Sequence, residues 1–188
     1  DHLDNDQIKK IQEKIKLIKY KRDQIDGILL NLNHHKPNYS RLIYPNEIKP
    51  IVNNTTINPE CSRSYGQDLL VVILVISKPN DFHRRKIIRE TWGSQVKKNS
   101  LVKIYFVIGK PHDQTDDSIQ NDIQYENHQF NDLIQFNFVD TYYNLTIKSL
   151  AMLRWSMVQC ALVKFVYKVD DDVIVNIENL ISFCNDHY

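Results

Sequence analysis

The alternation of short apolar runs with amphipathic segments constrains the fold of this chain more than any other feature of its sequence. The apolar runs that predict strands are residues 68–77, 102–109, 133–138 and 165–169. The segments that predict helices between them are residues 82–92, 116–127 and 145–162. This order predicts an α/β fold with a mostly parallel sheet and helices on both faces. Ligands of such sheets bind beyond the carboxyl ends of the strands.

The first 60 residues have a different pattern. Apolar residues recur at heptad spacing between Ile8 and Leu32, which predicts a helical stem over residues 1–33. A coiled coil that makes a homo-oligomer and a lone amphipathic helix both fit this spacing. Residues 34–60 are rich in proline and asparagine, which predicts a linker. We therefore expect the α/β domain over residues 61–188.

Composition excludes several classes of protein. Apolar residues make up 42% of the chain, which excludes wholesale disorder. The 24 basic and 23 acidic residues leave a net charge of +1, so nucleic acid is not an expected partner. The longest apolar run, residues 69–76, is far shorter than the roughly 20 residues that a membrane-spanning helix needs. We expect no membrane span within this sequence.

Two features concern the cellular compartment. The chain has four N-glycosylation sequons, which begin at Asn38, Asn53, Asn54 and Asn144. They favour the secretory pathway. The three cysteines, Cys61, Cys160 and Cys184, lack the spacing of a zinc or redox motif, so buried free thiols are the simplest interpretation of their spacing.

Three adjacent carboxylates, Asp170, Asp171 and Asp172, directly follow the last expected strand. Like charges this close repel one another unless a cation compensates them. Alternate residues of an extended segment point the same way, so Asp170 and Asp172 are expected to share one divalent ion while Asp171 faces elsewhere. The alternative is a solvated acidic turn, or the N-cap of a helix that begins near Asn176.

Two further segments add to this pattern. The basic residues of segment 84–93 follow the first strand, so their cations are expected near the same edge of the sheet. Basic groups together with a metal ion suit a diphosphate. The same segment also fits an amphipathic helix that buries Ile87, Ile88 and Trp92 and leaves its arginines in solvent. Segment 140–148 predicts the start of the next helix.

Taken in order, segments 85–93, 137–148, 154–155 and 167–176 resemble the motifs of the β-1,3-galactosyltransferase and β-1,3-N-acetylglucosaminyltransferase family. The resemblance spans about residues 61–184 and implies a GT-A fold, a UDP-sugar donor and a glycan acceptor on a glycoprotein or glycolipid. It also implies a Golgi-resident, single-pass type II membrane enzyme, with a luminal catalytic domain and an anchor before Asp1. The sheet would then be truncated after the strand that leads into the acidic run.

The resemblance also implies roles for particular residues. Asp170 and Asp172 would bind Mn²⁺, and Cys61 would pair with Cys160. The residues that would bind the donor are Arg85, Arg89, Lys148, Asp170 and Asp171. The catalytic base is expected downstream of Tyr188. One departure is Phe136-Asn137-Phe138, where members of the family often carry an aspartate.

The function that follows is an inverting hexosyltransferase, which moves galactose or N-acetylglucosamine from a UDP-sugar to a glycan in β-1,3 linkage. Two other functions stay open. One is a luminal carbohydrate-binding module without turnover. The other is a metal-dependent phosphotransferase in which Asp170 acts as the nucleophile. We also expect residues 165–169 to form an apolar edge of the sheet.

Overall fold

The structure is a computed structural model that describes residues 13, 16, 55–61, 64–112 and 117–187. The chain divides into two compact units, Asp1–Pro50 and Ile51–Tyr188. In the first unit only Glu13 and Lys16 are described, and both are helical and exposed. The rest of the predicted stem, and the sequons at Asn38, Asn53 and Asn54, lie outside the described residues.

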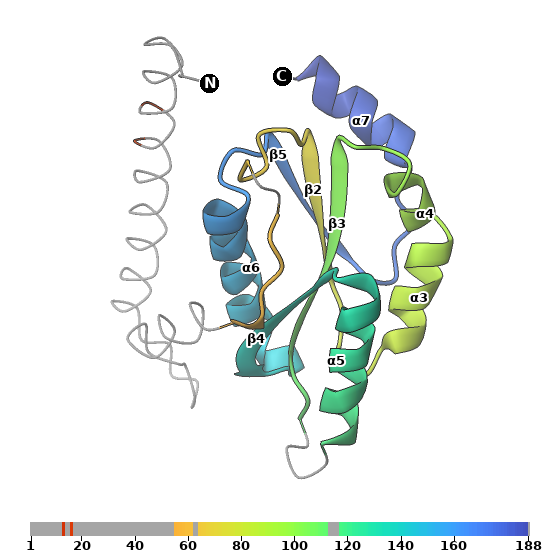
Figure 1. Ribbon diagram of the computed structural model, residues 1–188, viewed down its shortest axis with the longest axis vertical. Helices are drawn as coiled ribbons and strands as arrows, with labels where there is room; N and C mark the ends of the chain where they lie inside the picture. Colours follow the sequence, from red (N-terminus) through yellow and green to blue (C-terminus); the bar gives the residue numbers. More distant parts are fainter. Residues whose placement is uncertain (1–12, 14–15, 17–54, 62–63, 113–116, 188) are drawn as a thin grey trace. The chain divides into compact units, whose positions relative to one another are not determined.

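The second unit is built on one five-stranded sheet (Figure 1). Its strands are β1 (Thr55–Ile57), β2 (Val71–Ile76), β3 (Val102–Lys110), β4 (Leu133–Val139) and β5 (Phe165–Asp170). Their order across the sheet is β1-β4-β3-β2-β5. Neighbours among β2 to β5 are parallel, and β1 runs antiparallel to β4. The predicted mostly parallel sheet is confirmed.

Strand β1 corrects the linker prediction, because it lies inside residues 34–60. Thr56 Oγ1 donates to the Gln135 side chain of β4 across 2.9 Å, and Trp155 Nε1 donates to Asn58 Oδ1 across 2.7 Å. Both partners come from far along the sequence. The local pattern of prolines and polar residues therefore gives no sign of the strand.

The helices of this unit are α3 (Phe82–Glu90), α4 (Gly93–Val96), α5 (Ser118–Phe130), α6 (Leu145–Gln159) and α7 (Ile177–Asp186), with a 3₁₀ turn η1 (Tyr142–Asn144). The helix expected over residues 82–92 ends at Glu90, and α4 begins after a break. A Cβ atom on Gly93 would lie 2.6 Å from the carbonyl oxygen of Ile88. Glycine therefore lets the chain fold back closely against the end of α3.

The helices cover both faces of the sheet, as the sequence predicts. Figure 1 shows α6 on one side and α3, α4, α5 and α7 on the other. Val71, Ile73 and Val75 of β2 belong to the core cluster that contains Ile88 of α3 and Ile177 of α7. On the face of α6, the Trp155 ring meets the Tyr105 ring edge to face at 5.1 Å between centroids. Strand β2 is consequently buried on both faces.

The disulfide that the resemblance implies is present. Cys61, shortly before β2, is bonded to Cys160, at the end of α6, with 5.3 Å between their Cα atoms. Cys184 of α7 is a free thiol buried in the core. The bond ties the segment that follows β1 to the helix that leads into β5.

Strand β5 forms one edge of the sheet, as expected for residues 165–169. Val166 and Tyr167 of this strand stay partly exposed. None of the helices in the described part of the chain combines the length and apolar character that crossing a membrane requires.

Candidate functional site

The register of the parallel strands gathers the candidate residues at the carboxyl edge of the sheet. Asp170, the last residue of β5, lies beside Ile76, the last residue of β2. Ile76 in turn lies beside Val107 of β3, and Lys110 at the end of β3 lies beside Val139 of β4. The residues that follow these strands therefore meet at one edge, where α/β proteins bind ligands.

The three aspartates of the acidic run differ in exposure. The side chains of Asp170 and Asp172 are 62% and 68% exposed, whereas that of Asp171 is 11% exposed. The outer carboxylates thus face solvent, and the middle one points into the protein. Only Asp170 belongs to β5, whereas Asp171 and Asp172 lie in the turn that follows it, so the turn and not an extended segment sets these directions.

Only one of the two oxygens of the Asp171 carboxylate has a hydrogen-bond partner among the described residues. Its Oδ1 atom accepts a hydrogen bond from Arg84 Nη1 across 2.9 Å. Its Oδ2 atom is buried and has no hydrogen-bond partner in the described part of the chain. A buried acceptor without a partner costs free energy, so this oxygen suits a hydroxyl donor or a cation of a ligand.

Arg84 is a site residue that the sequence did not single out. Its Nη1 atom also lies 3.8 Å from Asp172 Oδ2, so one guanidinium group spans two of the three carboxylates. The hydrogen bond to Asp171, together with the charge of that carboxylate, raises the pKa of Arg84. The expectation that cations of segment 84–93 lie beside the acidic run is met by this residue.

Arg85 and Arg89, the arginines predicted to bind the donor, instead form a buried network between α3 and α5. Arg85 is fully buried, and its Nη2 atom lies 2.7 Å from Glu126 Oε2. Arg89 pairs with Glu126 across 2.8 Å and with Asp132 across 2.7 Å. Asp132 immediately precedes β4, so Arg89 reaches towards the opposite edge of the sheet. The described contacts give both arginines a structural role and offer no support for the donor-binding prediction.

Lys148 of α6 does lie at the carboxyl edge, but it is only 2% exposed. Its Nζ atom lies 2.6 Å from Asp140 Oδ2 and donates to the carbonyl oxygen of Ser77. The same oxygen of Asp140 accepts a hydrogen bond from the Gly109 N–H across 2.8 Å. Lys148 and Asp140 therefore tie together the ends of β2, β3 and β4.

The environment of Lys148 also has an electrostatic effect. Burial lowers its pKa, while the charges of Asp140 and Asp171 act in the opposite direction. Lys148 thus lies within electrostatic range of the buried carboxylate of the acidic run. A lysine that is buried and already bonded acts on a bound ligand chiefly by holding the strand ends in place.

Gly109 permits this close arrangement. A Cβ atom at this position would lie 2.7 Å from the carbonyl oxygen of Phe138 and 3.0 Å from the Asp140 Cβ. Any larger residue would push β3 away from β4 where Asp140 receives its hydrogen bonds. The absence of a side chain therefore helps to form the edge.

The turn after β4 places two aromatic rings at the same edge, which the sequence analysis did not single out. Tyr142 and Tyr143 are 86% and 92% exposed, and their rings meet edge to face. Next to them Asn144 Nδ2 donates to the Val139 carbonyl oxygen across 2.8 Å. The atom that would carry a glycan at this sequon is thus engaged in the turn, and glycosylation of Asn144 stays a prediction.

The acidic run was predicted to hold a metal ion. No group of three or more metal-binding side chains occurs among the described residues. Asp170 and Asp172 nevertheless offer exposed carboxylate oxygens, and their basic neighbours Lys168 and Arg84 stay 3.9 Å and 3.8 Å away. Such a pair fits a hard cation that takes its other ligands from water or from a bound phosphate.

The comparison with known families agrees with this geometry. The family profile described as Galactosyltransferase matches residues 83–188, more than half of the chain. The chain belongs to this galactosyltransferase family. The resemblance drawn from the ordered motifs is confirmed, and the sheet with its flanking helices is consistent with a GT-A-like fold.

Curated relatives of this galactosyltransferase-family chain carry names from the same group. It is 35% identical over 122 residues to the human lactosylceramide 1,3-N-acetyl-beta-D-glucosaminyltransferase. This match covers 63% of this chain and 32% of the relative. The chain is 32% identical over 179 residues to lactosylceramide 1,3-N-acetyl-beta-D-glucosaminyltransferase B of Danio rerio. This match covers 86% of this chain and 46% of the relative.

A third relative is the mouse UDP-GlcNAc:betaGal beta-1,3-N-acetylglucosaminyltransferase 7, which is 35% identical over 124 residues and is covered over 31% of its length. The chain therefore matches between 31% and 46% of the length of these relatives.

Proposed function

We propose that the protein is an inverting hexosyltransferase that binds a UDP-sugar at the carboxyl edge of its sheet and transfers the sugar to a glycan in β-1,3 linkage. The observation that carries the proposal is the acidic run itself. It presents two exposed carboxylates and one buried, half-satisfied carboxylate beside Arg84 at that edge. The family and the names of the relatives support a sugar as the transferred group.

In the proposed site each residue at the carboxyl edge of the sheet has its own role. Asp170 and Asp172 would hold Mn²⁺, which when bound neutralises the charge that develops on the departing UDP. Asp171 Oδ2 would accept a hydrogen bond from a hydroxyl group of the donor. Arg84 orients the Asp171 carboxylate, and the pair of Lys148 and Asp140 keeps the strand ends in register.

The acceptor hydroxyl must lose its proton as it attacks the anomeric carbon from the opposite face of the sugar. We propose that the base lies downstream of Tyr188, as the resemblance implies, because the carboxylates of this edge have other roles. Galactose and N-acetylglucosamine are both proposed donors. The acceptor is a glycan on a glycoprotein or glycolipid.

The proposed location is the Golgi lumen, with attachment to the membrane through a segment outside this sequence. The disulfide between Cys61 and Cys160 supports an oxidising compartment.

The proposal is tested by calorimetry of UDP binding with and without Mn²⁺. Asp172→Ala and Asp170→Ala should abolish the Mn²⁺-dependent binding, and Asp171→Ala should weaken it much less. Asp186→Ala, which removes an exposed acidic side chain of α7, is the matched control. Equal losses at all three positions of the acidic run would mean that only bulk charge matters there. Binding that ignores Mn²⁺ would contradict the proposed metal site.

Product analysis separates this function from its two alternatives. The full-length enzyme should form a β-1,3-linked sugar product from a UDP-sugar. Transfer of phosphate instead would favour the phosphotransferase, and sugar binding without any product would favour the carbohydrate-binding module.

A further inference from the structure

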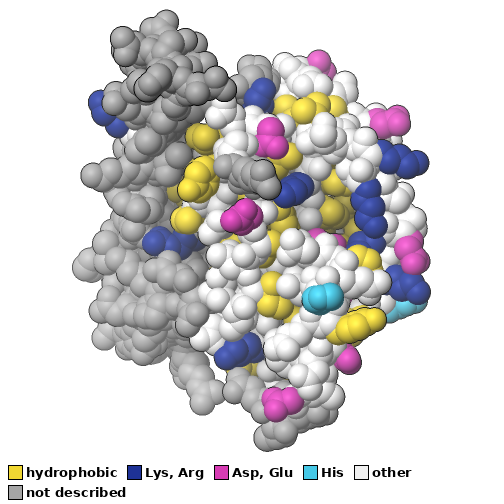
Figure 2. Space-filling view, viewed as in Figure 1, with side chains coloured by type: hydrophobic (Ala, Val, Ile, Leu, Met, Phe, Trp, Pro, Cys, Tyr) yellow, Lys and Arg dark blue, Asp and Glu magenta, His cyan; other side chains and the backbone are white. Residues whose placement is uncertain are grey.

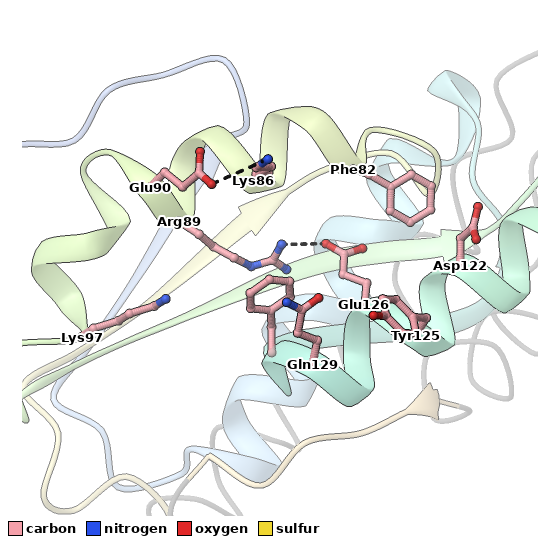
Figure 3. A pocket seen from close by; sticks show the side chains of 10 residues that line it. Phe82, Lys86, Arg89, Glu90, Lys97, Asp122, Tyr125, Glu126 and Gln129 are labelled. Carbon is pink, nitrogen blue, oxygen red and sulfur yellow. Dashed lines mark ion pairs between the residues drawn. The ribbon is translucent and has the colours of Figure 1, made fainter.

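A second candidate site lies away from the acidic run, in a pocket of about 580 Å³ between α3 and α5 (Figure 3). This volume falls in the range of about 300 to 1,000 Å³ that small-molecule sites occupy. The floor is the buried ion pair of Arg89 with Glu126. The guanidinium group of Arg89 also lies over the Phe130 ring, 4.1 Å from its centroid. The floor is thus rigid and internally neutralised.

The charges of the remaining side chains in this α3–α5 pocket also balance. Three basic residues, Lys86, Arg89 and Lys97, face three acidic residues, Glu90, Asp122 and Glu126. Lys86 pairs with Glu90 across 3.8 Å, which leaves Lys97 and Asp122 as the charges without an ion pair among the described residues. Figure 3 shows these two at opposite ends of the pocket. On the side of the molecule where α3 and α5 lie, Figure 2 likewise shows basic and acidic side chains close together.

This charge balance excludes strongly charged ligands. Among the described lining residues a phosphate group would find only one cation without an ion pair, Lys97, and that side chain is exposed to solvent. A cationic ligand would likewise find only one carboxylate without an ion pair among these residues, Asp122. A purely apolar ligand would cover the charged floor and remove water from it without replacing its hydrogen bonds.

The walls favour a ligand that is apolar on its faces and polar at its rim. Tyr125 is 73% exposed and Phe130 is 38% exposed. Gln129 and Asp122 come from the same helix and have no side-chain hydrogen bond within the described residues. Exposed aromatic rings pack against the C–H faces of a pyranose, and amide and carboxylate groups bond its hydroxyls.

We infer that the α3–α5 pocket binds a neutral sugar, separately from the proposed donor site at the carboxyl edge. The inference does not depend on the proposed transfer reaction. A neutral sugar satisfies every feature of the pocket: balanced charge, exposed aromatic surface and unused hydrogen-bonding groups.

The test is titration of the ¹⁵N-labelled protein with lactose, cellobiose and N-acetyllactosamine, followed by amide chemical shifts. At least one of these sugars should shift amides of α3 and α5. Tyr125→Ala should raise the dissociation constant about two- to tenfold, the size of one aromatic contact. Asp122→Ala should also weaken binding. Both side chains are exposed, so the variants should fold.

Two controls separate this site from the donor site. Gln124→Ala removes an exposed residue of α5 that does not line the pocket, and Asp172→Ala disrupts the proposed metal site. Neither should change the sugar titration. The inference is wrong if none of the three sugars shifts α3 and α5 amides, if Tyr125→Ala binds like the parent protein, or if inorganic phosphate binds in the pocket more tightly than the sugars.

Discussion

Arg84 Nη1 lies 2.9 Å from Asp171 Oδ1, and this contact joins the first turn of α3 to the end of β5. The two residues are far apart in the sequence, but they lie in segments that follow the neighbouring strands β2 and β5. Since β2 and β5 are parallel, the segments that follow them start from the same edge. The contact fixes the direction of a carboxylate that is flanked by two others.

Removal of the Arg84 side chain should weaken donor binding without unfolding the protein. We expect Arg84→Ala to reduce the affinity for UDP with Mn²⁺ about two- to fivefold, because the pair is partly exposed and screened by solvent. Lys86→Ala, which removes an exposed cation of the same helix, should leave the affinity unchanged. Calorimetry measures both. A larger effect of Lys86→Ala would show that the general positive charge of α3 matters more than the contact.

The buried pair of Lys148 and Asp140 should contribute strongly to stability. We expect Lys148→Met to lower the free energy of unfolding by about 3 to 5 kcal/mol, because it leaves the Asp140 carboxylate buried without its cation. The double variant Lys148→Met/Asp140→Asn should recover part of this loss. Urea denaturation gives the values, with Lys98→Met as the exposed control. A loss for Lys98→Met as large as that for Lys148→Met would contradict the assignment.

The same lysine should make stability depend on pH. Burial lowers the pKa of Lys148 below its ordinary value of 10.5, so the unfolded chain holds this proton to higher pH than the folded chain. Between the two pKa values the unfolded state binds more protons, and the contribution of Lys148 to stability therefore rises with pH. The stability difference between the parent protein and Lys148→Met should grow as the pH rises towards 10.5. A constant or shrinking difference would contradict this.

The disulfide should be a large part of the stability of the α/β unit. It closes a loop with a sequence separation of 99, for which chain entropy predicts about 4 to 5 kcal/mol. Reduction, or the double variant Cys61→Ser/Cys160→Ser, should lower the urea midpoint accordingly. Cys184 is buried and should react with thiol reagents only after unfolding. Peptide mapping without reduction that finds a free Cys61 thiol would refute the bond.

Several features were predictable because their signals are local. Apolar runs alternate with amphipathic segments, and this alternation predicted a mostly parallel sheet covered by helices on both faces. The place of Asp170, Asp171 and Asp172 directly after an apolar strand was visible in the sequence, although the turn that contains Asp171 and Asp172 was not. The ordered motifs identified the family, and the family implied the pairing of Cys61 with Cys160.

By contrast, Arg84 and Arg85 are adjacent basic residues, and of these two the resemblance assigned donor binding to Arg85 alone. The phase of α3 against the sheet decided that Arg85 is buried against Glu126 and that Arg84 reaches Asp171. Strand β1 depends on β4, about 80 residues away, and no local pattern encodes that partner. Local periodicity and residue type thus determined the elements and the acidic run. Long-range packing decided which of the charged side chains bind one another and which remain available to a ligand, because burial and pairing depend on neighbours that only the folded chain brings together.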